Sequence, residues 1–239
     1  MAAGSSSPVV RIAWLLLVWL GLTGLLVAAG IGVDHSSGVA AFDHHVTSFV
    51  VSHRSPGLNA AMKVITWLGS WVALTTVGVL ILVYAIRGRL PWAAVLAALT
   101  AWVGEAGAVA VAKHVVQRQR PPARVWLVSA HGWSWPSGHA ATAALVFAVL
   151  ALGASRAGWS SPRTTGVWIV AVLATAVVGF SRIELGVHWT TDVLASYAFV
   201  SLWLLAVVSL FPVTISGNTR MHPTGQPGAG QVGTTLGGS

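Results

Sequence analysis

Long apolar runs, broken only by a few charged positions, constrain this chain more than any other feature of its sequence. Of its 239 residues, 55% are hydrophobic and only 8% are charged, and the mean hydropathy is +0.77. A soluble domain needs far more charged side chains to cover its surface, so this balance indicates an integral membrane protein. The apolar segments leave too little chain for a second, soluble domain.

A stretch of about 20 apolar residues crosses a bilayer as an α-helix. On this criterion we expect an all-α integral membrane bundle of six transmembrane helices, at residues 12–33, 65–86, 91–116, 136–156, 165–180 and 187–211. The alternative for the first run is a cleavable signal peptide. The run is about twice as long as the apolar core of such a peptide, which favours a retained span.

The charges are few and one-sided, with 13 Lys and Arg against 5 Asp and Glu. They stand at the ends of the apolar runs rather than on one solvated face, which argues against a nucleic-acid partner and suits orientation in a bilayer. With six spans, one side receives six basic residues and no acid. We expect that side to be cytoplasmic, with an amino terminus at 1–11 and a disordered tail at 212–239.

The other, extracytoplasmic side receives the long loop at 34–63. Four apolar residues recur there at helical spacing: Phe42, Val46, Phe49 and Val50. The polar residues between them, such as Asp43, take other directions. We expect a short helix that lies in the membrane interface and ends near Pro56, the alternative being a loop without regular structure.

Unusual polar chemistry occurs in three separate stretches at span ends. The first runs from Lys113 to Arg120 and Pro121, the second is the sequence Pro-Ser-Gly-His at 136–139, and the third runs from Ser181 to Asp192. Because the spans alternate in direction, all three stretches fall at the same membrane surface and can converge.

The basic residues suit a phosphate group. Lys113, Arg120 and Arg182 can neutralise an anion, and arginine offers forked donors that match phosphate oxygens. Ser137 and Gly138 stand where the fourth span begins, so their free backbone N–H groups and the helix dipole favour the same anion.

The remaining polar residues suit bond making and breaking. His188 and Asp192 are four residues apart and therefore share one helix face. The carboxylate can accept from one imidazole nitrogen and leave the other as a nucleophile. His139 is a candidate acid for the leaving oxygen.

The pattern Lys-x6-Arg-Pro, Pro-Ser-Gly-His and Ser-Arg-x5-His-x3-Asp resembles the type 2 phosphatidic acid phosphatase superfamily, with every motif position present. The resemblance implies a six-span phosphatase domain at 12–211 and a phosphohistidine formed on His188, which Asp192 orients. It implies that His139 protonates the leaving group. It also implies that the other five residues hold the phosphate: Lys113, Arg120, Ser137, Gly138 and Arg182. With three fixed cations, we expect no metal or other cofactor.

We expect a lipid substrate that enters sideways from the bilayer of the cell membrane. Among substrates we rank a polyprenyl diphosphate first and phosphatidic acid or phosphatidylglycerophosphate second. The related vanadate haloperoxidases are soluble, which the apolar spans disfavour here. A non-catalytic lipid or anion binder, or a transporter, is the other alternative, but both the nucleophile and its orienting acid are present. The sequence leaves the oligomeric state open.

Several residues near the motifs receive simpler interpretations. We expect Arg118 and Arg124 to be membrane-surface anchors. Four tryptophans are expected to form an aromatic belt: Trp126, Trp133, Trp135 and Trp189. Glu105, inside the third span, is either a functional acid or a protonated side chain bonded to a neighbouring helix.

Overall fold

A computed structural model describes residues 7–157 and 159–211 of the chain. The described part holds eight α-helices and two 3-10 turns and no strand, which confirms the all-α class. In chain order they are α1 (Pro8–His35), α2 (Ser37–Ser52), α3 (Pro56–Ile65), η1 (Thr66–Gly69), α4 (Trp71–Ile86), α5 (Trp92–Val116), η2 (Ala123–Val125), α6 (Gly138–Arg156), α7 (Ser161–Glu184) and α8 (Thr190–Leu210). The tail expected at 212–239 lies outside the described residues.

Five described helices are long and apolar enough to cross a membrane: α1, α5, α6, α7 and α8. The remaining expected span, at 65–86, falls on a bent pair of helices, in which α3 with η1 meets α4 at an angle of 42°. The break falls at Ser70, which has an extended backbone and accepts a hydrogen bond from Ala73 N to start α4. Beside it, a Cβ added to Gly69 would lie 2.4 Å from the carbonyl oxygen of His139, so only glycine allows η1 to lie this close to α6.

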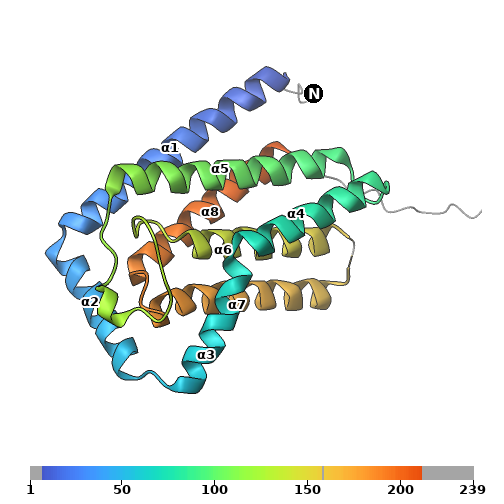
Figure 1. The fold of residues 1–239 in the computed structure, drawn as a ribbon. Helices are drawn as coiled ribbons and strands as arrows, with labels where there is room; N and C mark the ends of the chain where they lie inside the picture. Colours follow the sequence, from blue (N-terminus) through green and yellow to red (C-terminus); the bar gives the residue numbers. More distant parts are fainter. Residues whose placement is uncertain (1–6, 158, 212–239) are drawn as a thin grey trace, which may run out of the picture.

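The helices pack with α6 against α7 and α8, and with α1 against α5 and α8 (Figure 1). Tryptophan side chains join neighbouring helices by donating to backbone carbonyls. Trp19 of α1 donates to Gly104 O at 2.7 Å, and Trp203 of α8 donates to Ala101 O at 3.0 Å. These carbonyl oxygens accept from indole N–H groups that lipid could not satisfy.

The connections alternate between the two ends of the bundle. In Figure 1 the segment 117–137 and the turn between α7 and α8 lie at one end with α2 and α3, and the α4–α5 and α6–α7 connections lie at the other. The prediction that the three polar stretches share one membrane surface agrees with this arrangement.

The loop at 34–63 forms two helices rather than one, since α2 ends at Ser52 and α3 begins at Pro56. The apolar residues that were expected to share one face of this helix differ in their exposure. Phe42 and Phe49 are about half exposed, whereas Val50 is buried against α6, α7 and α8. Asp43 is turned into the protein and is 1% exposed. The position of α2 in a membrane interface stays a prediction.

Two of the expected spans were shorter than the observed helices. Helix α1 begins at Pro8 rather than residue 12, after Ser7, whose hydroxyl accepts from Val10 N at 3.4 Å. Helix α7 covers Ser161–Glu184 rather than 165–180. A hydropathy criterion ends a span at the first polar residues. The last turn of α7 is nevertheless helical, and it buries Arg182 and Glu184 inside the protein.

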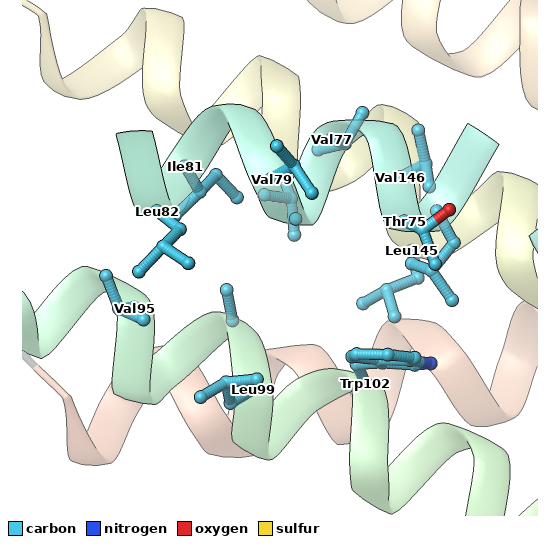
Figure 2. A pocket seen from close by; sticks show the side chains of 14 residues that line it. Thr75, Val77, Val79, Ile81, Leu82, Val95, Leu99, Trp102, Leu145 and Val146 are labelled. Atoms are coloured by element: carbon cyan, nitrogen blue, oxygen red, sulfur yellow. The ribbon is translucent and has the colours of Figure 1, made fainter. Parts of the chain in front are cut away.

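An apolar cavity of about 300 Å³ lies between α4, α5 and α6. Figure 2 shows side chains of α4, such as Ile81 and Leu82, facing Val95 and Leu99 of α5 across it. Its lining is hydrocarbon apart from Thr75 and Trp102, and it contains none of the eight candidate site residues. The cavity therefore suits a lipid environment and is distinct from the polar site.

Candidate active site

The segment 117–137 brings the first two motifs together. Helix α5 ends at Val116, and the left-handed backbone of the next residue, Gln117 (φ 52°, ψ 34°), turns the chain sharply. The segment folds back on itself and on the end of α7, since Ser134 N donates to Arg118 O at 2.8 Å and Leu127 N donates to Leu185 O at 3.0 Å. The third motif is thereby placed against the first.

His188 and Asp192 form a buried pair. Nδ1 of His188 lies 3.2 Å from Oδ2 of Asp192, and the two side chains are 3% and 0% exposed. The same Oδ2 accepts from Trp189 N at 2.9 Å and from the Ser134 hydroxyl. Since an ionised carboxylate only accepts hydrogen bonds, the Nδ1 of His188 carries the proton and its Nε2 has the free lone pair.

That Nε2 faces a cation. Nη1 of Arg120 donates to it at 3.1 Å, and Arg120 is fixed by further donations to four carbonyl oxygens, those of His131, Gly132, Trp133 and Val187. Burial lowers the pKa of His188 to about 3, against the raising effect of Asp192 and with a further lowering by Arg120 and Lys113. The imidazole is therefore neutral, as a nucleophile must be. Burial also lowers the pKa of Arg120, although Asp192 opposes this.

The other two cations of the motifs lie in the same cluster. Lys113, at the end of α5, donates to Trp133 O at 2.6 Å and interacts electrostatically with Arg120 and Arg182. Arg182 donates through Nη1 to the Thr66 hydroxyl at 2.6 Å, and its Nε is buried without a hydrogen-bond partner among the described residues. A buried donor that the protein itself leaves unpaired beside other cations suits the binding of an anion.

The start of α6 completes the cluster. Ser137 caps the helix, accepting from Ala140 N at 3.5 Å, while its own N–H donates to Asp192 O at 3.2 Å. Within the described part, no hydrogen bond uses the N–H groups of Gly138 and His139. A Cβ added to Gly138 would meet no atom within 4 Å, so space for an anion is open beside it. His139 lies within electrostatic reach of Arg182, Arg120 and Lys113. All eight predicted residues thus meet in one region.

The interpretation of Arg118 as a membrane-surface anchor was wrong. Arg118 is 4% exposed and donates to Asp192 Oδ1 and Asp43 Oδ2, both at 2.7 Å. Asp43 was not among the predicted site residues, since its side chain was expected on the polar side of an interfacial helix. An acidic residue within an otherwise apolar, helical loop was the only available signal, and its partner 75 residues away could not be read from spacing. Arg124, in contrast, is exposed.

The aromatic-belt interpretation fails for two of the four tryptophans. Trp135 is 2% exposed and donates to Leu26 O of α1 at 3.0 Å. Trp189 is 7% exposed and donates to Gln119 O at 2.8 Å. Both rings lie within 6 Å of the Arg118 guanidinium, so they form part of the site's walls.

Two further features bear on the chemistry. The side chain of Glu105 is buried within α5, with 3% exposed. No group of three His, Asp or Glu side chains in the described ranges has an arrangement that could hold a metal ion. Metal independence stays a prediction, to be tested by activity in chelator.

The bundle and the site define a class of protein, a membrane-embedded phosphatase. The model of the PAP2 superfamily matches residues 91–215, which include all three motifs. Phosphatidylglycerophosphatase B of Bacillus subtilis is 33% identical over 175 residues, covering 73% of this chain and 84% of the relative. The chain therefore belongs to the PAP2 superfamily, and it is a phosphatase of the membrane lipid phosphatase group.

Another relative and two solved structures agree with this assignment. Undecaprenyl-diphosphatase of Sulfolobus acidocaldarius is 28% identical over 111 residues, so that the match spans 43% of this chain and only half of that protein. The crystal structure of a transmembrane PAP2 type phosphatidylglycerolphosphate phosphatase from Bacillus subtilis superposes with a TM-score of 0.69 at 29% identity, covering 87% of this chain and 98% of that one. Aquifex aeolicus LpxE shares the fold, with a TM-score of 0.56 at 20% identity over 69% of this chain and 93% of its own.

Proposed function

We propose that the protein hydrolyses a lipid phosphate through a phosphohistidine on His188. The observation that carries the proposal is the orientation of the His188 ring, with Nδ1 held on Asp192 and Nε2 facing Arg120 at 3.1 Å. A phosphoryl group bound by Arg120 would present its phosphorus to the lone pair of Nε2. Asp192 would stabilise the positive charge that the imidazole acquires on attack.

The first step forms the bond from Nε2 to phosphorus and breaks the bond from phosphorus to the lipid oxygen. His139, protonated when the substrate is bound, gives its proton to the departing oxygen, so the lipid leaves as an alcohol or as a lipid phosphate. In the second step the neutral His139 takes a proton from water, and the resulting hydroxide attacks the phosphohistidine. Inorganic phosphate leaves and His188 is restored.

The cluster of cations would supply the electrostatic stabilisation of phosphoryl transfer. Lys113, Arg120 and Arg182 come from three separate segments, and the open N–H groups of Gly138 and His139 add donors at the start of α6. Preorganised donors of this kind lower the barrier by stabilising the charge on the phosphoryl oxygens.

We infer that phosphatidylglycerophosphate or a related glycerolipid phosphate is the first substrate to test. The support is the relative named phosphatidylglycerophosphatase B, which matches over more of its length and at higher identity than the undecaprenyl-diphosphatase. This reverses the order that the sequence alone favoured. The polyprenyl diphosphate stays the second candidate because of the similarity to that diphosphatase. We further propose that the site faces the extracytoplasmic side of the cell membrane.

The test is phosphate release by the purified protein in detergent, with phosphatidylglycerophosphate, phosphatidic acid and a polyprenyl diphosphate at equal concentration. We expect phosphatidylglycerophosphate to have the highest kcat/KM, and His188→Ala to abolish release from all three. If His188→Ala releases phosphate at the wild-type rate, the mechanism is wrong. If the polyprenyl diphosphate is hydrolysed with the highest kcat/KM, only the choice of substrate is wrong.

A further inference from the structure

Two buried carboxylates from separate helices share one guanidinium behind the active site. Arg118 donates through Nη1 to Asp192 of α8 and through Nη2 to Asp43 of α2, each at 2.7 Å. The three side chains are 5%, 0% and 1% exposed. A buried charge is stable only when it is paired, so this arrangement has a strong energetic preference for keeping all three members together.

Arg118 determines how the Asp192 carboxylate is turned. It binds Oδ1, which leaves Oδ2 for the His188 ring, the Ser134 hydroxyl and the Trp189 N–H. Every hydrogen bond of the carboxylate thus fixes the same rotation about its axis. If the bond from Arg118 were lost, Oδ1 would be unanchored and only the bonds to Oδ2 would hold the carboxylate, so the acceptor of His188 Nδ1 would be less firmly oriented.

Asp43 holds the same site from the other side. Its Oδ1 accepts from Thr191 N at 3.0 Å, and its Oδ2 accepts from the Thr191 hydroxyl at 2.5 Å as well as from Arg118. Thr191 lies in the first turn of α8, directly before Asp192. Asp43 therefore fixes both the guanidinium and the backbone that carries the carboxylate.

Neither residue is available to bind phosphate. Asp43 is an acid, and both terminal nitrogens of Arg118 are engaged by carboxylates. The Nε of Arg118 lies 3.8 Å from Asp34 Oδ1, so this atom too faces an acid. The role of the pair must then be exerted through Asp192 and His188.

We propose that Asp43 and Arg118 are positioning residues for phosphoryl transfer, which hold Asp192 in the orientation that aligns His188. This inference rests on the proposed function of His188. It makes α2 part of the catalytic apparatus, although α2 carries none of the three sequence motifs. It also explains why Arg118, which lies between Lys113 and Arg120 in the sequence and has no phosphate to bind, is buried.

The experiment compares Asp43→Asn and Arg118→Gln with Arg124→Gln, which alters an exposed arginine of the same segment. We expect kcat to fall about 10- to 100-fold in the first two variants, as when outer-shell partners of a reacting group are removed, and to stay at the wild-type value in Arg124→Gln. KM and the Ki of inorganic phosphate should stay within about twofold of wild type, since the cations that hold phosphate are unchanged. Loss of phosphate binding with unchanged kcat would contradict the proposal.

The double variant Asp43→Asn/Arg118→Gln tests whether the two residues act as one unit. We expect its kcat to equal that of Arg118→Gln alone, because residues in one network are not additive. If the two effects multiply, the two residues act independently and the proposed unit is wrong. Arg118→Lys keeps a charge but cannot bridge both acids, so its kcat should also be lowered. If Arg118→Gln does not fold, Arg118→Lys replaces it, alone and together with Asp43→Asn, in the comparison of single and double variants.

His188→Ala is included so that the two proposals can fail separately. If His188→Ala is active, the proposed function is wrong. If His188→Ala is inactive while Asp43→Asn behaves like Arg124→Gln, the mechanism stands and the positioning role is wrong.

Discussion

At the scale of single residues, the environment of His188 determines what its imidazole can do. A histidine that is 3% exposed, bonded at Nδ1 to a carboxylate and facing an arginine at Nε2, is kept neutral by burial despite its acidic neighbour. The burial that disfavours the protonated ring keeps the imidazole neutral across the physiological pH range, as the proposed nucleophilic role requires.

The lowered pKa of His188 predicts a specific titration. Because the folded pKa is about 3, the ring should remain neutral from pH 8 to pH 5. Nitrogen NMR of histidine-labelled protein, with the signal assigned by its absence in His188→Ala, measures this directly. A midpoint near 6.5 would contradict the account.

The same shift has a consequence for stability. The unfolded chain binds a proton at His188 below about pH 6.5 and the folded protein does not, so this residue favours unfolding as the pH falls through 6.5 towards 3. We expect the melting temperature of His188→Gln to fall less between pH 7 and pH 4.5 than that of the wild type. Equal decreases in the two proteins would show that His188 is not the group responsible.

Glu105 gives a second prediction at this scale. It precedes Lys113 by eight residues on α5, which places it about 12 Å further along the helix from the site. We expect Glu105→Gln to retain the wild-type kcat and pH dependence, because the carboxyl cannot reach a bound phosphate. A clear loss of turnover with unchanged stability would make Glu105 functional.

At the scale of helices, close contacts between α5 and α8 depend on glycine. A Cβ added to Gly104 would lie 2.4 Å from the Trp203 indole, and Trp203 is 3% exposed and held by a hydrogen bond to Ala101. We expect Gly104→Ala to lower the free energy of unfolding by about 1–3 kcal/mol, the usual cost of forcing extra atoms into a packed core. Thermal unfolding in detergent measures this.

Gly78→Ala is the matched control, because Gly78 lies within α4 and an added Cβ there would meet nothing within 4 Å. It should leave the melting temperature unchanged or raise it, since alanine is the better helix former. Equal destabilisation in both variants would show that the contact with Trp203 is not the cause.

Part of this architecture could be predicted from the sequence. Hydropathy located α1, α5, α6 and α8 to within a few residues, because a lipid environment requires long apolar segments. It could not reveal the break at Ser70, which accompanies the close approach of Gly69 to α6, or the extension of α7, whose last turn buries Arg182 against Thr66, since both depend on distant parts of the chain. For the same reason the motifs gave the eight site residues, whereas Asp43 and Arg118 emerged only from the contact between α2 and α8.

At the scale of the whole molecule, the alternation of spans predicts which surfaces face each side of the membrane. The chain has no cysteine, so single cysteines can report sidedness without further changes. Ser129 lies in the segment 117–137 beside the site, and Ser161 lies at the opposite end of the bundle, where α7 begins. Both are exposed.

We expect Ser129→Cys to react with an impermeant maleimide in intact cells, and Ser161→Cys to react only after lysis. The cysteine-free parent protein is the control for background labelling. Labelling in the reverse order would place the site on the cytoplasmic side and would overturn the orientation that the charge distribution favours.

The central claim is that His188 carries the phosphoryl group during turnover. It is tested most directly by quenching the enzyme a few milliseconds after mixing with radiolabelled lipid phosphate and locating the label by mass spectrometry. The account predicts an acid-labile, base-stable phosphoryl group on His188 in the wild type, which is absent from His188→Ala. A label on any other residue, or steady turnover by His188→Ala, would contradict it.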